Sequence, residues 1–230
     1  MKEVFKKILK IVRNILICIF LSSILFTVLY RFVPVPLTPL MFIRSSGQLL
    51  KGEKIKLQKK WVSLENISPN LIQAVVAGED NNFLSHFGFD FEAIKKAQVH
   101  NKNGKSTRGA STITQQTAKN VFLWPKRSYL RKGLEAYFTL LIELFWSKQR
   151  IMEVYLNVIE TGNGIYGAEA ASKVYFKKSA KNLNQNEAAL ISAILPNPRV
   201  WKADKPGPYV RHRKNLILRI MSKIDPVKFD

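Results

Sequence analysis

Residues 68–88, SPNLIQAVVAGEDNNFLSHFG, contain the signals that set the fold of this chain. Ser68 is a favourable N-cap residue and the proline after it fits the first helical turn, so a helix should begin here. Apolar side chains then recur at helical spacing, and Gly78 should end the helix. The helix therefore places two carboxylates, Glu79 and Asp80, at its C-terminal end.

The segments that follow carry similar helical patterns. Thr112 and Gln115 have the spacing of a capping box, which marks the start of another helix. Further helices are expected from Ser128 to about Trp146, over residues 151–158, over residues 168–175, and from Glu187 to Leu195. No convincing set of alternating strands is present, and Asn163-Gly164 breaks the chain, so the fold should be mainly α.

The N-terminus has the composition of a membrane anchor. Residues 15–30 are uncharged and would span about 24 Å as a helix, slightly short of a ~30 Å hydrocarbon core, and Arg13 and Arg31 can extend toward its edges. Basic side chains precede the run, which favours a cytoplasmic N-terminus and an exported remainder. A cleaved signal peptide is the alternative; because the run has no small-x-small cleavage site, a retained anchor is favoured.

These patterns divide the chain into four parts. They are a basic cytoplasmic tail (1–13), a transmembrane anchor (14–33), a juxtamembrane segment (34–60) and a globular domain (61–222). The prolines at the start of the juxtamembrane segment should make a stiff, extended exit from the membrane; they are Pro34, Pro36 and Pro39.

The chain has 230 residues and a formal net charge of +21, from 37 basic and 16 acidic side chains. Six of these basic residues and one acidic residue fall within residues 1–31, so the remainder keeps an excess of about 16 positive charges. Such a body attracts nucleic acid, anionic lipid or phosphorylated substrates, with a plain solvated basic surface as the alternative. The single cysteine, Cys18, excludes an intramolecular disulfide.

Two acidic positions are candidates for proton transfer. Glu79 follows an apolar helix, where partial desolvation would raise its pKa and suit it to act as an acid or base. An exposed acidic pair is the alternative, although the helix dipole disfavours acids at a C-terminus. Glu135 precedes an apolar stripe and is either a second buried acid or an ordinary helix-stabilising residue. Paired carboxylates are a recurring solution for transfer at a sugar carbon.

Basic and neutral polar residues lie between these two acids in the sequence. The cations can hold a pyrophosphate, with arginine offering bidentate geometry, and they are Lys119, Lys126, Arg127, Arg131 and Lys132. Neutral hydrogen-bonding partners are nearby at Thr112, Gln115 and Gln116. Residues 101–109, NKNGKSTRG, have the composition of a mobile loop at a cleft edge.

Four strings resemble the ordered motifs of the peptidoglycan glycosyltransferase family, whose members occur alone or fused to penicillin-binding transpeptidases. EDNNFLSHFG (79–88) matches ED-x-x-F-x-x-H-x-G, and GASTITQQTAKN (109–120) matches G-x-S-T-I-T-Q-Q-x-x-K-N. RKGLE (131–135) and KQRIMEVYLN (148–157) match R-K-x-x-E and K-x-x-I-x-x-x-Y-L-N. The strings YGAEAASKVYF and LPNP resemble the closing segments, so the resemblance covers about residues 61–200.

This resemblance implies a lysozyme-like α-helical lobe with a smaller hydrophobic lobe against the bilayer. It makes Glu79 the catalytic base and Glu135 the second essential acid, which either orients cations or helps a divalent cation (Mg or Mn) to bind. It places Lys119 and Arg127 at the donor pyrophosphate. Ser111, Gln115 and Gln116 would form the donor-site wall, and the other substrate-binding residues would be Asp80, Thr112, Asn120, Arg131 and Lys132.

The implied reaction polymerises lipid II into β-1,4-linked glycan with inversion and release of polyprenyl pyrophosphate. It would occur at the outer or periplasmic face of the cytoplasmic membrane. The implied partners are lipid II, the growing glycan strand, the bilayer, and cell-wall synthesis or division proteins, but not nucleic acid.

Two other functions fit parts of the sequence. A lysozyme-like hydrolase or lytic transglycosylase would need neither the cation cluster nor a lipid tether. A membrane-anchored basic binding protein would need no buried acid pair. The sequence contains no S-x-x-K and no K-[ST]-G, so a monofunctional enzyme without a transpeptidase is expected.

Overall fold

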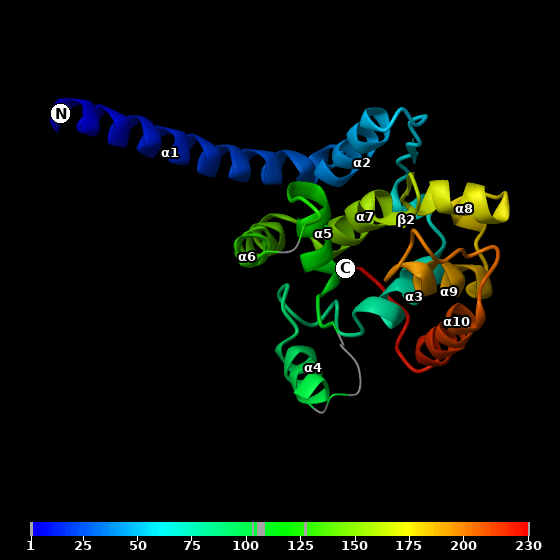
Figure 1. Cartoon of the computed structure of the whole chain (residues 1–230). Coiled ribbons are helices and arrows are strands. Elements are labelled where there is room, and N and C mark those ends of the chain that lie inside the picture. Colours follow the sequence, from blue (N-terminus) through cyan, green and yellow to red (C-terminus); the bar gives the residue numbers. More distant parts are fainter. Residues whose placement is uncertain (1, 103, 105–108, 127, 230) are drawn as a thin grey trace.

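The computed structural model describes residues 2–102, 104, 109–126 and 128–229, and its fold is mainly α, as predicted. The helices are α1 (Lys2–Phe32), α2 (Pro39–Leu50), α3 (Pro69–Glu79), α4 (Phe91–Lys102), α5 (Ile113–Phe122), α6 (Tyr129–Phe145), α7 (Lys148–Val158), α8 (Ala168–Phe176), α9 (Gln185–Ile194) and α10 (Pro208–Met221). The short strands are β1 (Gln58–Lys59), β2 (Glu160–Gly162) and β3 (Ile165–Tyr166). Figure 1 shows these elements gathered into one body from which α1 projects.

The capping signals in the sequence set the starts of the main helices. The side chain of Ser68 accepts a hydrogen bond from the backbone N–H of Asn70 at the start of α3. Thr112 and Gln115 form the expected capping box on α5, and Ser128 caps α6. These contacts are local, so the sequence alone predicts them.

Gly78 does not end α3, which continues to Glu79. The glycine is required for close packing instead, because a Cβ atom at this position would lie 2.4 Å from Oγ of Ser192 on α9. That hydroxyl donates to the carbonyl of Ala74, at 2.8 Å. The tight contact brings α3 and α9 together and fixes the end of α3, where Glu79 stands.

The sequence patterns do not predict three of the helices, which are α2, α4 and α10. In the juxtamembrane segment, the prediction of an extended exit is wrong at Pro39, which occupies the first turn of α2 behind the N-cap Thr38. Proline has this preference for the first helical turn because its missing N–H needs no partner there. Leu40 and Met41 of α2 are buried, so the helix is docked on the body.

The three strands form a small sheet in the order β1-β3-β2. β1 runs parallel to β3, and β2 is antiparallel to it across the break at Asn163-Gly164. Gly164 has a positive φ of 75°, and a side chain there would meet the backbone of Lys56. The sheet therefore ties the chain leaving α2 to the segment after α7.

The helices form two groups around a common apolar core. α3 packs against α9 and α10, while α5 packs against both α6 and α7. Tyr155 of α7 and Phe83, after α3, are among the largest fully buried side chains. The C-terminal end of α3 therefore lies beside α5, which brings the first two sequence motifs together.

Helix α1 is long and apolar enough to cross a membrane. It is continuous from Lys2, so the described part of the basic tail is helical as well. Its second half contacts the body: Ser23 shares a hydrogen bond with Tyr137 of α6 at 2.8 Å, and Nε1 of Trp146 donates to the Thr27 carbonyl at 2.7 Å. Helix α1 and the body are thus in direct contact.

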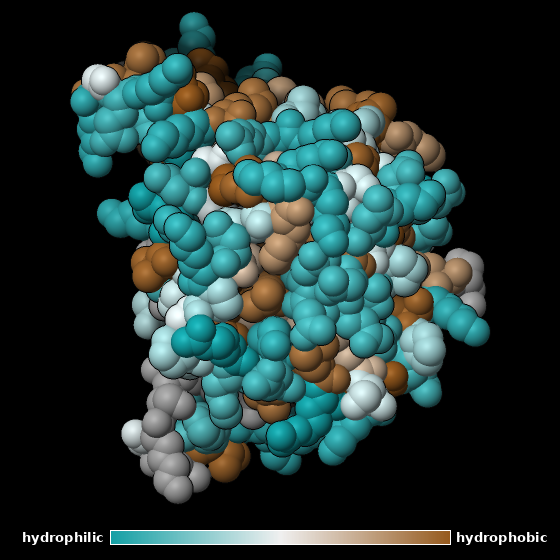
Figure 2. Space-filling model, turned by 90° about the vertical axis from the view of Figure 1, so that its right-hand side faces the viewer, coloured by the Kyte–Doolittle hydropathy of each residue, from teal (hydrophilic) through white to brown (hydrophobic). Residues whose placement is uncertain are grey.

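Two cations hold the end of α1 in place. Arg150 of α7 donates two hydrogen bonds to the Tyr30 carbonyl, at 2.8 and 3.0 Å, and Lys59 donates to the Pro36 carbonyl at 2.8 Å. Both cations lie over the ring of Trp61. Figure 2 shows the side of the body opposite the projecting end of α1, and mostly hydrophilic residues cover it. The face that lies away from the projecting end of α1 is therefore mostly polar.

Candidate active site

Glu79 is the last residue of α3, and its carboxylate is held between two other helices. Nε2 of Gln116 on α5 donates to one oxygen at 2.9 Å, and a guanidinium nitrogen of Arg213 on α10 donates to the other at 3.0 Å. Only 12% of the Glu79 side chain is exposed. Burial raises the pKa of Glu79, while Gln116, Arg213 and the charge of Lys119 oppose the rise.

A second polar layer supports this arrangement. The hydroxyl of Tyr155, fully buried in α7, donates to Oε1 of Gln116 at 3.2 Å. Burial also raises the pKa of Tyr155. A neutral tyrosine therefore fixes the orientation of the glutamine amide, so that its N–H faces Glu79. The amide N–H makes a hydrogen bond to the carboxylate of Glu79 but cannot transfer its proton to it.

Asp80 faces the interior. It accepts a hydrogen bond from the backbone N–H of Ile113, at 3.0 Å, and Nε2 of His86 lies 2.9 and 3.1 Å from its two oxygens. Ile113 is the first residue of α5, so Asp80 ties the end of α3 to the start of α5. These contacts make Asp80 a positioning residue, because they fix the end of α3 relative to α5 and so hold Glu79 next to Gln116.

Glu135 has a different environment, although it is the same type of residue. It is buried in α6, where a guanidinium nitrogen of Arg131 donates to one oxygen at 2.8 Å and Lys132 pairs with the other. The side chain of Arg131 is 10% exposed, and that of Lys132 is 51% exposed. Both Glu135 oxygens are thus occupied by cations, which it holds in place.

Lys119 is close enough to both acids for their charges to act on it. Burial lowers its pKa, and the charges of Glu135 and Glu79 oppose that change while Arg131 and Lys132 reinforce it. Within the described ranges, the side chain of Lys119 has no hydrogen bond or ion pair. A half-buried ammonium group near two acids and two other cations, but paired with none, is available to an anionic ligand.

The other predicted residues separate into several environments. Thr112 and Gln115 are buried and use their side chains in the capping box, and Thr112 also donates to the Gly88 carbonyl at 2.7 Å. Ser111 is exposed beside them. Arg127 lies outside the described residues. The predicted loop at residues 101–109 is also outside them for the most part.

A cavity of about 220 Å³ opens beside Gln116 and Lys119. Apolar side chains and prolines from α2, the loop after α5 and the loop after α9 form much of its wall, together with Asn120, Arg44 and Glu160. Burial raises the pKa of Glu160, and the charges of Arg44, Arg199 and Lys119 oppose this. The cavity therefore adjoins the site through Gln116 and Lys119, and it is large enough for part of a ligand.

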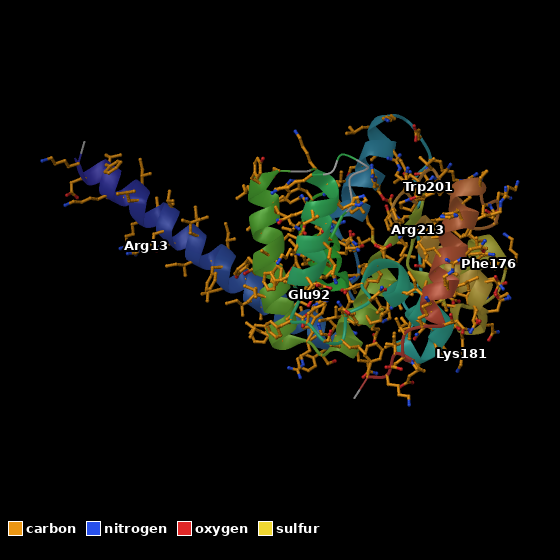
Figure 3. All side chains as sticks on the ribbon, turned by 90° about the horizontal axis from the view of Figure 1, so that it is seen from below. Arg13, Glu92, Phe176, Lys181, Trp201 and Arg213 are labelled. Carbon is orange, nitrogen blue, oxygen red and sulfur yellow. The ribbon has the colours of Figure 1, made fainter. Side chains whose placement is uncertain are left out.

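Sequence reasoning missed Arg213, Arg44 and Glu160. Arg213 extends from α10 toward the interior of the body (Figure 3), and it stands far from Glu79 in the sequence. Arg44 lies on the missed helix α2 and is 3.6 Å from Glu160. The basic character of residues 211–214, RHRK, gives no sign of which side chain faces inward, and only the packing of α10 on α3 reveals it.

No group of three or more histidine, cysteine, aspartate or glutamate side chains in the described parts of the chain is arranged to hold a metal ion. A divalent cation therefore stays an untested prediction.

A helical body, an N-terminal helix long enough to span a membrane, and a desolvated carboxylate near a cation cluster are together typical of a membrane-associated enzyme. The family model described as Transglycosylase matches residues 46–222 of this chain. The chain belongs to the transglycosylase family, which confirms the resemblance seen in the motifs. The match begins within α2, upstream of the first motif.

Characterised relatives support the same assignment. A biosynthetic peptidoglycan transglycosylase of Bdellovibrio bacteriovorus is 59% identical over 207 residues, covering 90% of this chain and 82% of the relative. One from Bacteroides thetaiotaomicron is 55% identical over 226 residues, covering 97% and 91% of the two chains. One from Haemophilus influenzae is 53% identical over 214 residues, covering 92% and 87%. The prediction of a glycosyltransferase of peptidoglycan synthesis is confirmed.

Proposed function

We propose that this protein polymerises lipid II into β-1,4-linked glycan strands and releases polyprenyl pyrophosphate. The observation that carries the proposal is the position of Glu79, a desolvated carboxylate held by Gln116 and Arg213 beside the unpaired Lys119. A carboxylate with a raised pKa is suited to take a proton from a hydroxyl, and a nearby cation is suited to a phosphorylated leaving group.

In the proposed reaction, Glu79 removes the proton from the 4-hydroxyl of the acceptor's N-acetylglucosamine. The oxygen attacks the anomeric carbon of the donor's N-acetylmuramic acid, and the bond from that carbon to the pyrophosphate oxygen breaks. The α-linked donor becomes a β-1,4 link with inversion. The electron pair leaves with the polyprenyl pyrophosphate, whose new charge needs stabilisation.

The cations near Glu135 match that need. We assign Lys119 and Arg127 to the donor pyrophosphate, with Arg131 and Lys132 beside it. Glu135 holds Arg131 and Lys132 through its two oxygens, so its role here is to organise positive charge. Fixed cations aimed at the developing charge stabilise the transition state more than the ground state. We assign Ser111, Gln115 and Gln116 to the donor-site wall.

The membrane arrangement follows from α1. With the basic residues before the apolar run on the cytoplasmic side, the body lies on the outer face of the cytoplasmic membrane. Lipid II carries its polyprenyl tail in the same bilayer, so tethering raises the effective concentration of the substrate. A C-terminal reporter that is active only outside the cytoplasm should therefore work, and an active cytoplasmic reporter would contradict this orientation.

Incubation of the purified full-length protein with lipid II in detergent micelles tests the activity. Glycan polymer and polyprenyl pyrophosphate should form together. A parallel sample with a metal chelator tests whether the reaction needs a divalent cation, because loss of activity there would show that it does. No reaction on lipid II together with cleavage of intact sacculi would identify a cell-wall hydrolase instead. Inactivity on both substrates would favour a binding protein.

A further inference from the structure

Trp124 differs from the other tryptophans of the chain, all of which belong to the apolar core or pack on it. Trp61 lies beneath two cations, Trp146 donates a hydrogen bond to α1, and Trp201 packs against a tyrosine ring. Trp124 is half-buried, and within the described residues it contacts no ring or cation and makes no hydrogen bond. Its indole N–H is not enclosed either, because the buried unpaired groups belong to other residues. A large aromatic side chain without a partner is suited to contact a ligand.

Trp124 lines the cavity beside Lys119, and local contacts fix it there. The residue before it, Leu123, has a buried side chain, and its N–H donates to the carbonyl of Lys119 at 3.1 Å. The residue after it, Pro125, restricts the backbone of Trp124 to extended conformations. The indole is therefore held at a set place relative to Lys119, which is assigned above to the donor pyrophosphate. A platform fixed in advance loses little freedom when a ligand binds.

The wall of the cavity combines apolar and polar side chains in a way that suits a sugar ring. Beside Trp124 stand three prolines, which are Pro125, Pro196 and Pro198. The half-buried side chains of Gln116, Lys119 and Arg44 supply polar groups. A pyranose ring has apolar faces of C–H bonds and a rim of hydroxyl groups, so one face can lie on the indole while the rim meets polar groups. A polyprenyl tail has no polar rim, and packing it against Lys119 and Arg44 would desolvate their charges.

The position of the cavity selects the sugar ring that is attached to the pyrophosphate. Lys119 lines the cavity, whereas Glu79, to which the acceptor hydroxyl must come, is not among the described residues that line it. The donor's N-acetylmuramic acid carries the pyrophosphate on its anomeric carbon, so a pyrophosphate at Lys119 brings this ring to the adjoining wall. The volume of about 220 Å³ is below the ~300–1,000 Å³ of pockets that enclose a whole ligand, so the cavity takes one ring rather than the full disaccharide.

We propose that the N-acetylmuramic acid ring of the donor stacks on the indole of Trp124, which orients its anomeric carbon for attack. The proposal rests on lipid II as the substrate. It gives the donor two fixed points: Lys119 holds the pyrophosphate, and Trp124 holds the ring to which the pyrophosphate is attached. Two such points set the direction of the bond that breaks, and a reacting bond held in the correct direction needs less reorganisation to reach the transition state.

Exchange of the indole for an aliphatic or an aromatic side chain tests the proposal. Trp124→Leu keeps an apolar wall but removes the flat ring, so kcat/KM for lipid II should fall by on the order of 10-fold. Trp124→Phe keeps a ring and should stay within about threefold of wild type. Phe176→Leu exchanges a half-buried aromatic side chain at the end of α8, outside the cavity, and should keep the wild-type kcat/KM. Equal kcat/KM values in Trp124→Leu and Trp124→Phe would overturn the proposal.

Polyprenyl pyrophosphate, which carries no sugar, separates stacking from other roles of Trp124. Its inhibition constant in the polymerisation assay should be the same for wild type and Trp124→Leu, because it reaches Lys119 and leaves the indole uncovered. If the polyprenyl tail lay on Trp124, inhibition would weaken together with kcat/KM. If Trp124 only supported the fold around Lys119, inhibition would weaken as well. Either result would overturn the proposal.

Tryptophan fluorescence gives a second measurement, which does not require Trp124→Leu to fold. Lipid II should shift the emission of the wild-type protein, and Trp124→Phe should lose most of this shift although it still polymerises lipid II. A shift of the same size in Trp124→Phe would contradict stacking on this residue. A wild-type enzyme that cannot polymerise lipid II would refute the proposed function itself, whereas normal polymerisation by every Trp124 variant would refute only the stacking.

Discussion

Two glutamates in one site illustrate how surroundings divide roles between identical side chains. Glu79 stands at the end of α3 and has a raised pKa because of burial, with one arginine and one neutral amide as partners. Glu135 stands within α6 with a cation on each oxygen. The first environment favours proton transfer and the second favours fixed positive charge, which matches the proposed roles of Glu79 as base and Glu135 as organiser of cations.

The largest effect is expected when the base is removed. Glu79→Gln should lower kcat by about 10²- to 10⁴-fold, because general-base catalysis contributes that much. The fold should be retained, since the amide keeps the volume and relieves the burial of a charge. Polymerisation kinetics together with thermal unfolding measure both effects. More than half of the wild-type rate in this variant would remove Glu79 from the role.

Loss of the unpaired cation should come next in size. Lys119→Met should lower kcat by about 10²-fold, similar to the loss of one preorganised donor to a developing charge. Its effect should fall mainly on kcat, because the leaving group gains charge only in the transition state. Lys95→Met removes an exposed charge on α4 and serves as the control. Equal, small effects in both variants would indicate general attraction to the substrate.

Replacing Glu135 should lower the stability of the folded protein as well as its rate of polymerisation. Glu135→Gln leaves the buried Arg131 without its charged partner, which should lower the free energy of unfolding by about 2–3 kcal/mol. Lys132 adds little, because its side chain is 51% exposed and screened by solvent. The midpoint of thermal unfolding should fall by about 2–4 °C per kcal/mol. If Glu79→Gln destabilised the protein more, the comparison between the two acids would be wrong.

The pH dependence of stability should also separate the two acids. The folded-state pKa of Glu79 is raised, so the folded protein binds its proton more tightly than the unfolded chain does. Its contribution to stability is therefore present at low pH and is lost as the pH rises through the raised pKa. Glu79→Gln should remove this loss, so the difference in stability from wild type should grow toward neutral pH.

The sequence predicts those parts of the site that depend on local signals. The caps at Ser68, Thr112 and Ser128 are contacts within a few residues, and they set α3, α5 and α6 correctly. Glu79 and Glu135 are candidates from their positions on these helices, and the ordered motifs imply their separate roles, which stay predictions. The order of the motifs therefore contributed more to the prediction of the site than composition or helical periodicity did.

Long-range packing explains what the sequence did not predict. Gly78 was interpreted as a helix end, yet it makes room for Ser192, more than 100 residues away in the sequence. The contact of Asp80 with the start of α5 depends on how α5 docks against α3, and its predicted role in substrate binding stays a prediction. Arg213 reaches Glu79 only because α10 packs on α3. Each case involves a tertiary contact with no local signal.

The smallest effect, a shift in pH dependence, tests how Arg213 tunes the base. Its charge and its hydrogen bond both lower the pKa of Glu79, against the rise that burial causes. Arg213→Gln removes the charge, so the pKa of Glu79 should rise further. Because Glu79 acts as a base in its ionised form, the acidic limb of kcat/KM should move to higher pH, while the rate on the plateau should change less.

Arg211→Gln is the matched control, since it removes an exposed charge from the same helix. The difference between the two profiles isolates the contact from the general loss of positive charge near an anionic substrate. An acidic limb that stays in place in Arg213→Gln, or moves to lower pH, would mean that Glu79 does not set that limb. In that case another titrating group would set the limb, and the assignment of Glu79 as the base would be wrong.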